Sequence, residues 1–551
     1  MVDKLDPHCL VALMSHAFKG NQDGRSRSID PISVNPEYGI TNSRETSERT
    51  FPILDAIASI SVSQERSQVV AVGLKLNAKE QEIRLIIAEN NDVEPRLVAH
   101  IQYLWSLLQA LSDECAANRG GLDRDEDGSP DIPEDVALLL RIKIFREIYQ
   151  FSLQKEMKRV SKWWDPLLNF VKELVKRRGD ALQGFESDLF DVLAALNCVR
   201  DLIHRLHPIP AQGLTDDEWE RVYNYSMWAN EKVGLVLADR NSFGCEILAA
   251  ELNDYMQGYR DNRQTPSSSF LIPETSEREL YEDSPSSSRK EAFRLRRALE
   301  KLTSLTRHIE CLITFANSPR LRPALQYDMS ICTVPGEART VQLPGSQQQW
   351  KEFMEIAAGK VLPWQEDVAA TLAHSFNERV CVCRAHCECT LVQYLATSHG
   401  ESWDHVPAFT YIGVSKLSCS ACSTWLDAFN DMGQRRFHTR GSHRKWYWPW
   451  GMPKEEEPLE EVIAPECSRE VGPDKLFRVT LARKISRQYV EHLKEQRVYR
   501  SGSDSTTASL SRGKRHLSNA QIESVRSRLA AVTKKFRGTI GRHLDSMSYQ
   551  S

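Results

Sequence analysis

Hydrophobic and polar positions follow two kinds of pattern along this chain, one typical of strands and one typical of helices, so both are expected. The apolar runs 68–76 and 83–87 are joined by a polar turn and predict a β-hairpin that ends at Asn90 and Asn91. A short helix is expected just before the hairpin, over 51–60. Across the next 150 residues the apolar positions instead recur at helical spacing, which is typical of a packed helical core.

Strand-type and helix-type patterns also alternate in the last third of the chain. Val380–Cys383 and Phe409–Val414 are apolar and predict two buried strands. Helices are expected to begin at His386 and at Ser418, because apolar residues follow each of them at helical spacing. The sequence therefore predicts strand, helix, strand and helix in this order.

Four polar residues in this segment carry recognisable chemistry. His386 and Glu388 form a His-x-Glu pair, and Cys419 and Cys422 form a Cys-x-x-Cys pair further along. One His and two Cys fill three corners of a zinc tetrahedron and leave the fourth for water, which is the open arrangement of a catalytic site. Glu388 is then placed to move protons, and the combination is typical of zinc-dependent base deaminases.

Two other interpretations of these residues stay open. Cys381, Cys383, Cys387 and Cys389 crowd the same region, so a closed structural zinc site built from Cys ligands is one alternative. Buried and chemically inert cysteines are the other.

At these residues the chain resembles the fungal OTT-type deaminase-like family of the zinc-dependent nucleic acid/nucleotide deaminase superfamily. The resemblance rests on His386-x-Glu388, on the run from Tyr411 through Cys419-x-x-Cys422, and on Arg440-Gly441-Ser442-His443 with Trp446 following. Two positions depart from the superfamily pattern. Ser418 stands where a Pro usually precedes the first Cys, and Cys387 stands where Ala often lies between His and Glu.

The resemblance implies an α/β three-layer deaminase-like domain, a mixed sheet with helices on both faces, here combined with a large, mainly α-helical region. It also implies one Zn²⁺ held by His386, Cys419 and Cys422. The expected function is a hydrolytic deaminase acting on a nucleobase in a nucleoside, nucleotide or nucleic acid. Metal-bound hydroxide would attack the amino-bearing carbon while Glu388 shuttles protons. The alternative is a catalytically inactive binding module for nucleic acid or protein that retains a structural zinc.

Deaminases of this superfamily begin with a helix and a hairpin, which residues 51–91 would supply. An Asn at the end of the second strand contacts the nucleoside sugar in several of them, and Asn90 or Asn91 occupies the similar position. The alternative for both is that they cap a turn, as Asn often does. The segments 329–334 and 340–343 are an alternative source of strands.

The sequence predicts seven regions along the chain. In order they are a loose N-terminal arm (1–50), a possible first helix and hairpin of the deaminase-like fold (51–91), a helical region (92–260), a disordered linker (261–290), a helical and strand connector (291–364), the zinc core (365–452), and an acidic loop followed by a basic, partly disordered tail (453–551).

Two further stretches are candidates for binding. Asp123, Asp125, Asp127, Asp131 and Glu134 match the spacing of an EF-hand calcium loop, although Pro130 and Pro133 disfavour calcium and an acidic linker explains the same residues. Residues 435–450 interleave cations with large aromatics, which favours a nucleotide or single-strand contact surface that includes His443 and Trp446. The alternative is a strand whose aromatics cover the sheet.

Composition adds little beyond the compartment. The chain of 551 residues has 41% hydrophobic and 26% charged residues and a formal net charge of −4, as in an ordinary soluble protein. Thirteen cysteines without a secretory leader favour a reducing intracellular location, cytoplasmic or nuclear, and no membrane association is expected. Residues 475–542 hold 17 Lys and Arg against 4 Asp and Glu, so this tail would suit nucleic acid, nuclear import or solubility alone.

Overall fold

The computed structural model describes residues 5–19, 44–121, 134–178, 185–206, 213–238, 295–359, 365–433, 435–454 and 473–495, together with Val525 and Arg528. The helices are α1 (Pro7–Phe18), α2 (Arg44–Ile60), α3 (Pro95–Gly121), α4 (Glu134–Phe151), α5 (Leu153–Arg178), α6 (Phe185–His204), α7 (Asp216–Ala238), α9 (Leu295–Leu302), α10 (Ser304–Ala316), α11 (Arg322–Leu325), α12 (Gln347–Ala358), α13 (Gln365–Ser375), α14 (Cys387–Ala396), α15 (Ser420–Met432) and α16 (Pro473–Glu495). The strands are β1 (Val70–Asn77), β2 (Glu82–Glu89), β3 (Asp328–Val334), β4 (Ala338–Gln342), β5 (Val380–Arg384) and β6 (Gly413–Val414).

The main sheet is mixed and has four strands in the order β3-β2-β1-β6. The hairpin strands β1 and β2 are antiparallel, and β6 pairs antiparallel with β1. β3 pairs parallel with β2, from Glu82 opposite Asp328 to Ala88 opposite Val334. β4 and β5 form a separate antiparallel pair. The strand after Asp328 and the hairpin, weighed as alternatives from the sequence, therefore lie in the same sheet.

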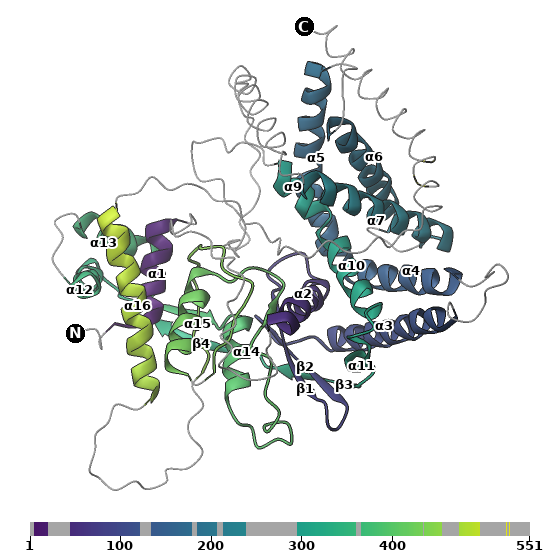
Figure 1. The fold of residues 1–551 in the computed structure, drawn as a ribbon. Coiled ribbons are helices and arrows are strands. Elements are labelled where there is room, and N and C mark those ends of the chain that lie inside the picture. Colours follow the sequence, from purple (N-terminus) through teal and green to yellow (C-terminus); the bar gives the residue numbers. More distant parts are fainter. Residues whose placement is uncertain are drawn as a thin grey trace.

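The two faces of this sheet are covered by two different hydrophobic cores. Because side chains alternate along a strand, Val70, Val72 and Leu74 of β1 pack into a core with α2, α3 and the other helices of the helical region. Ala71 of β1 and Ile86 of β2 point the other way, into a core with α14 and α15. The result is an α/β fold with helices on both faces, and Figure 1 shows the sheet with α14 and α15 between two groups of helices.

The close approach of α2 to the sheet depends on a glycine. A Cβ built on Gly413 of β6 would lie 2.3 Å from the backbone carbonyl carbon of Leu54 on α2. No side chain fits at that distance, so only glycine lets this strand pack directly on the helix.

The prediction of a loose N-terminal arm over 1–50 is wrong for residues 5–19, which are folded. α1 is a buried helix whose N-cap Asp6 accepts a hydrogen bond from the backbone N–H of His8, and Pro7 occupies its first turn. The apolar run from Leu10 to Met14 is almost fully buried in the core that also contains α14, α15 and α16. His8 also accepts a hydrogen bond through Nε2 from the N–H of Met452, which links α1 to the end of the zinc core.

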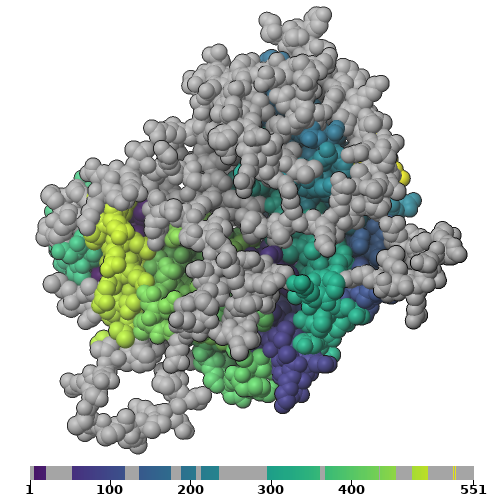
Figure 2. All heavy atoms as spheres, viewed as in Figure 1, coloured from purple at the N-terminus to yellow at the C-terminus, as the bar shows by residue number. Residues whose placement is uncertain are grey.

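The first part of the basic tail is likewise a packed helix. Leu481, Ala482, Ile485 and Tyr489 recur at helical spacing on α16 and are buried. This stripe packs against α15, α1 and α12, and Figure 2 shows α16 in yellow alongside the green atoms of the zinc core.

Several expectations fall on residues outside the described part of the chain. These are the acidic positions Asp123, Asp125, Asp127 and Asp131 of the candidate calcium loop, the linker 261–290, and most of 453–551. Glu134, the last residue of that loop, begins α4. Among the described helices, none combines the length and apolar character needed to cross a membrane.

Candidate active site and metal centre

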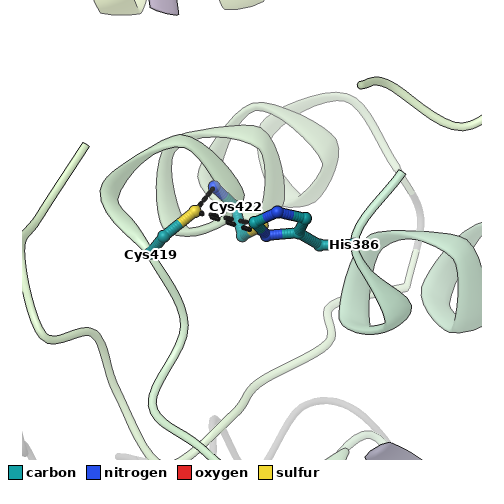
Figure 3. Close-up of side chains that lie close together, drawn as sticks. All are labelled: His386, Cys419 and Cys422. Atoms are coloured by element: carbon teal, nitrogen blue, oxygen red, sulfur yellow. Dashed lines mark hydrogen bonds between the residues drawn. The ribbon is translucent and has the colours of Figure 1, made fainter. Parts of the chain in front are cut away.

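Three buried side chains converge where α14 and α15 begin. His386 Nδ1 lies 3.7 Å from Cys419 Sγ and 3.2 Å from Cys422 Sγ, and the two sulfurs are 3.4 Å apart. Figure 3 shows the three side chains pointing at one another from two helices. Among the described residues, this is the one group of His, Cys, Asp and Glu side chains with metal-site spacing.

The spacing of this group fits zinc. Zn–S bonds of ~2.3 Å and Zn–N bonds of ~2.05 Å at tetrahedral angles place two sulfurs ~3.8 Å apart and a sulfur ~3.6 Å from a nitrogen. The observed separations of 3.2 to 3.7 Å lie within a few tenths of an ångström of these values. The donor set of one imidazole and two thiols is also one that zinc prefers.

The first residues of two helices position the candidate metal ligands. His386 is the N-cap of α14, and Cys419 is the N-cap of α15, so both stand at positive helix ends. The N–H of Cys422 donates to Cys419 Sγ at 3.4 Å, and the indole N–H of Trp450 donates to Cys422 Sγ at 3.3 Å. These donors stabilise thiolates, whereas burial raises the pKa of both thiols well above its usual range in the absence of a cation.

The other crowded cysteines do not join this group. Cys381, Cys383, Cys387 and Cys389 lie outside the cluster of potential ligands. Cys389 contacts Cys422 through a hydrogen bond between the side chains, and burial raises its own pKa to about 12, so it stays a thiol. A closed site made of four Cys ligands is therefore not what the geometry offers.

Glu388 lies one residue inside α14 and lines a cavity together with His386 and Cys419. The thiol of Cys387 donates to Glu388 Oε2 at 3.5 Å. Burial raises the pKa of the Cys387 thiol well above its usual range, so this donor keeps its proton. The departure from Ala at this position thus adds a contact to the carboxylate.

The two candidate Asn residues have different surroundings. Asn90 lines the cavity, and its side-chain oxygen accepts a hydrogen bond of 3.0 Å from the N–H of Cys387 at the start of α14. Asn91 is exposed, and its side-chain oxygen accepts a hydrogen bond of 2.5 Å from Arg384. Asn90 is therefore next to the metal ligands, whereas Asn91 is not among the residues that line the cavity.

The departure at Ser418 also has a structural consequence. Its backbone N–H donates to the carbonyl of Gly441 at 3.1 Å, and its own carbonyl accepts from the N–H of His443 at 3.0 Å. A proline at this position would lack the first bond. Gly441 has a φ of 118°, which favours glycine and turns the chain between Arg440 and His443.

The aromatic stretch after α15 divides between core and cavity. Phe437, Trp446, Trp448 and Trp450 are buried in the core on the α14 side of the sheet. Trp446 is 1% exposed and does not line the cavity, so the structure places this candidate substrate-binding residue in the core. His443 does line the cavity, and so does Tyr447, which the sequence did not single out.

The cavity next to the metal ligands has a volume of about 250 Å³, and the helical region supplies much of its wall. Six cations come from two helices, namely Lys155, Lys158, Arg159 and Lys162 on α5 of the helical region and Arg297 and Lys301 on α9 of the connector. The sequence reasoning missed them because it treated this region as core only. The signal was their spacing of three, four and seven residues on α5 and four on α9, which places each set on one helix face.

Comparison with known proteins agrees with this site. A family model described as "OTT_1508_deam:-like deaminase" matches residues 385–454, which include all three metal-ligand candidates and Glu388. No curated protein and no solved structure matches the chain. The match indicates a deaminase-like domain over these residues, and the His-Cys-Cys cluster is compatible with zinc.

Proposed function

We propose that this protein is a zinc-dependent hydrolytic deaminase that acts on a nucleobase in a nucleoside, nucleotide or nucleic acid. The observation that carries the proposal is the joint exposure of His386, Cys419 and Glu388 to one cavity. A structural zinc site is usually closed by four protein ligands. Here three candidate ligands converge, and a carboxylate stands beside them at the cavity wall.

His386, Cys419 and Cys422 would hold the zinc. When bound, zinc supplies Lewis acidity that makes a water molecule acidic near neutral pH. The chain itself supplies the proton transfers. Glu388 accepts the proton of the attacking water on its carboxylate, donates it to the ring nitrogen of the base and assists the departure of ammonia.

Neighbouring residues keep Glu388 in position for these transfers. The Cys387 thiol bonds to its Oε2, and the start of α14 is fixed by the side chain of Asn90 on the β2 side. Because Asn90 also lines the cavity, it is placed to contact the sugar or the base. His443 lies on the same cavity wall and is a further candidate contact for substrate.

The test is ammonia release from a panel of nucleosides, nucleotides and single-stranded oligonucleotides, with the wild type beside Glu388→Gln. We expect turnover of at least one amino-bearing base by the wild type. The variant should lose about 10²- to 10⁴-fold in rate, the usual worth of a positioned acid–base group. Its zinc content, measured by mass spectrometry, should stay at one per chain.

Two results would contradict the proposal. Zinc without ammonia release from any member of the panel would favour the binding module, and loss of zinc from Glu388→Gln would show that this carboxylate is part of the metal site rather than the proton carrier.

A further inference from the structure

The side chain of Arg440 is a buried cation that the fold leaves without a hydrogen-bond acceptor. It is 7% exposed, and within the described part of the chain no group accepts a hydrogen bond from any of its three guanidinium nitrogens. Burying a charge in this way is costly unless a partner completes it. Arg440 lines the cavity beside the metal ligands, so a ligand there is placed to be that partner.

The nearest acidic group inside the protein is already engaged. Asp55 on α2 interacts electrostatically with Arg440, but its Oδ2 accepts a bond of 2.7 Å from the Tyr411 hydroxyl. Its Oδ1 accepts a bond of 2.9 Å from the N–H of Val414. Asp55 therefore holds β6 and its neighbours in place and does not supply the missing acceptor for Arg440.

The other charged residues that line the cavity are mostly cations as well. The described residues that line it include eight Lys and Arg but a single carboxylate, that of Glu388. Acidic side chains outside the lining lie near some of these cations: Arg159 pairs with Glu156 at 2.5 Å, Lys158 approaches Glu65 at 3.8 Å, and Lys155 also interacts with Glu156. The cations still far outnumber the acids that face the cavity, which makes it a strong attractor of anions.

The nearby positive charges affect the protonation of His308 on α10. Its side chain lines the cavity, and its pKa lies well below the usual range because of burial and the nearby charges of Arg440, Arg307 and Arg159. The imidazole is therefore neutral at physiological pH. It adds a polar group to the cationic part of the cavity lining without a further charge.

These features give the cavity lining two parts with different chemistry. The metal ligands and Glu388 come from the starts of α14 and α15, and most of the cations come from α5 and α9. The stripe from Lys155 to Lys162 on α5 spans about 10 Å at 1.5 Å per residue, enough to face a short chain of phosphates. Guanidinium groups such as that of Arg440 match phosphate oxygens in a fork geometry.

We propose that the substrate is a nucleoside that carries a 5′-phosphate or polyphosphate group, which binds between Arg440 and the cations of α5 and α9. This inference rests on the proposed function, because the base would occupy the part of the same cavity next to the metal ligands. It assigns the helical region a role in substrate recognition. We take a free nucleotide rather than a strand as the ligand, because the cations line one pocket together with the metal ligands, whereas strand-binding surfaces are extended grooves.

The test measures binding separately from turnover, using the full-length Glu388→Gln protein in titration calorimetry. The ligands are adenosine, cytidine and guanosine, their 5′-mono- and triphosphates, tripolyphosphate alone, and a mixed-sequence single-stranded oligonucleotide. For at least one base, the triphosphate should bind roughly tenfold to hundredfold more tightly than the nucleoside, as expected for charge-assisted hydrogen bonds. Tripolyphosphate should compete with that nucleotide.

Paired substitutions locate the binding site. Lys162→Gln with Lys301→Gln removes one cavity cation from each helix and should weaken triphosphate binding about tenfold or more while nucleoside binding stays constant. Lys172→Gln with Arg296→Gln removes the same charge from the same two helices outside the cavity lining and should change binding by less than about twofold. Arg440→Lys keeps the charge but loses the fork, and should also weaken triphosphate binding.

Each outcome separates this inference from the proposed function. Equal binding of nucleoside and nucleotide, or equal effects of the two double variants, overturns the phosphate site even if ammonia is released. Binding of the oligonucleotide alone replaces the free nucleotide with a strand and also overturns it. Phosphate-dependent binding sensitive to Lys162 and Lys301, without ammonia release by the wild type, would keep the phosphate site and discard the deaminase.

Discussion

The two faces of the main sheet are built on different principles. On one face, helices α2 to α7, α9 and α10 pack their apolar stripes against one another and against Val70, Val72 and Leu74. On the other face, the short helices α14 and α15 pack with α1, α12, α13 and α16 and with an irregular segment after α15 that carries buried tryptophans. Regular helices can be stable through packing alone, whereas we expect α14 and α15 on the second face to depend also on the metal that their first residues would hold.

Removing a metal ligand should have the largest effect on the difference in stability between the two faces. Cys422→Ala should lower zinc from one per chain to nearly none and cost several kcal/mol of stability, because metal binding energy is folding energy. Hydrogen exchange should rise in α14 and α15 while α6 and α7 stay protected. Cys383→Ala, which removes an equally buried thiol outside the ligand cluster, should keep the zinc. Equal loss of protection on both faces would refute the contrast.

A smaller effect is expected from adding a methyl group to either of two glycines, one packed against α2 and one on the open side of α7. Gly413→Ala forces a Cβ against the backbone of Leu54 and should lower the free energy of unfolding by about 1 to 3 kcal/mol. Gly234→Ala on α7 adds its Cβ to open space and should raise it by about 0.5 to 1 kcal/mol through helix propensity. Urea unfolding of both variants measures the difference, and the same sign for both would contradict the packing described for β6.

The smallest effect is expected from the buried carboxyl group of Glu310 on the helical face, which makes stability depend on pH. Burial raises the pKa of Glu310 on α10 to about 7, and its Oε2 accepts a hydrogen bond of 2.5 Å from Asn230. Between roughly pH 4.5 and 7 the folded protein therefore binds more protons than the unfolded chain, and stability falls as pH rises through this window. Glu310→Gln should flatten this slope and add about 1 kcal/mol at pH 8. Urea titrations at pH 5 and pH 8 measure it, and an unchanged slope would exclude Glu310 as its source.

The metal-ligand candidates could be read from the sequence because their chemistry depends on residue type and short spacing. His386 with Glu388, and Cys419 with Cys422, each lie within one helical turn, and the structure brings the two pairs together. The hairpin was also visible, and its strands lie at 70–77 and 82–89. The two apolar runs and the polar turn between them were sufficient to predict both strands.

What the sequence did not reveal depends on contacts between distant segments. Lys155 and Lys301 face the metal site only because the helical region folds back over it, and no local pattern encodes that contact. The parallel pairing of β2 with β3 is similarly non-local. α1 is a different case, since Asp6 and Pro7 before an apolar run are a local helix-start signal that the sequence itself contains.

The parallel pairing of β2 and β3 has a consequence for how the protein is made. β3 begins about 240 residues after β2 ends, and at roughly 5 to 20 residues per second a ribosome needs some tens of seconds to synthesise that interval. During this time the hairpin has neither of its outer neighbours, because β6 is synthesised later still. The helices between them emerge first, so the nascent chain can protect the apolar hairpin with its own helical region before the metal ligands have been translated.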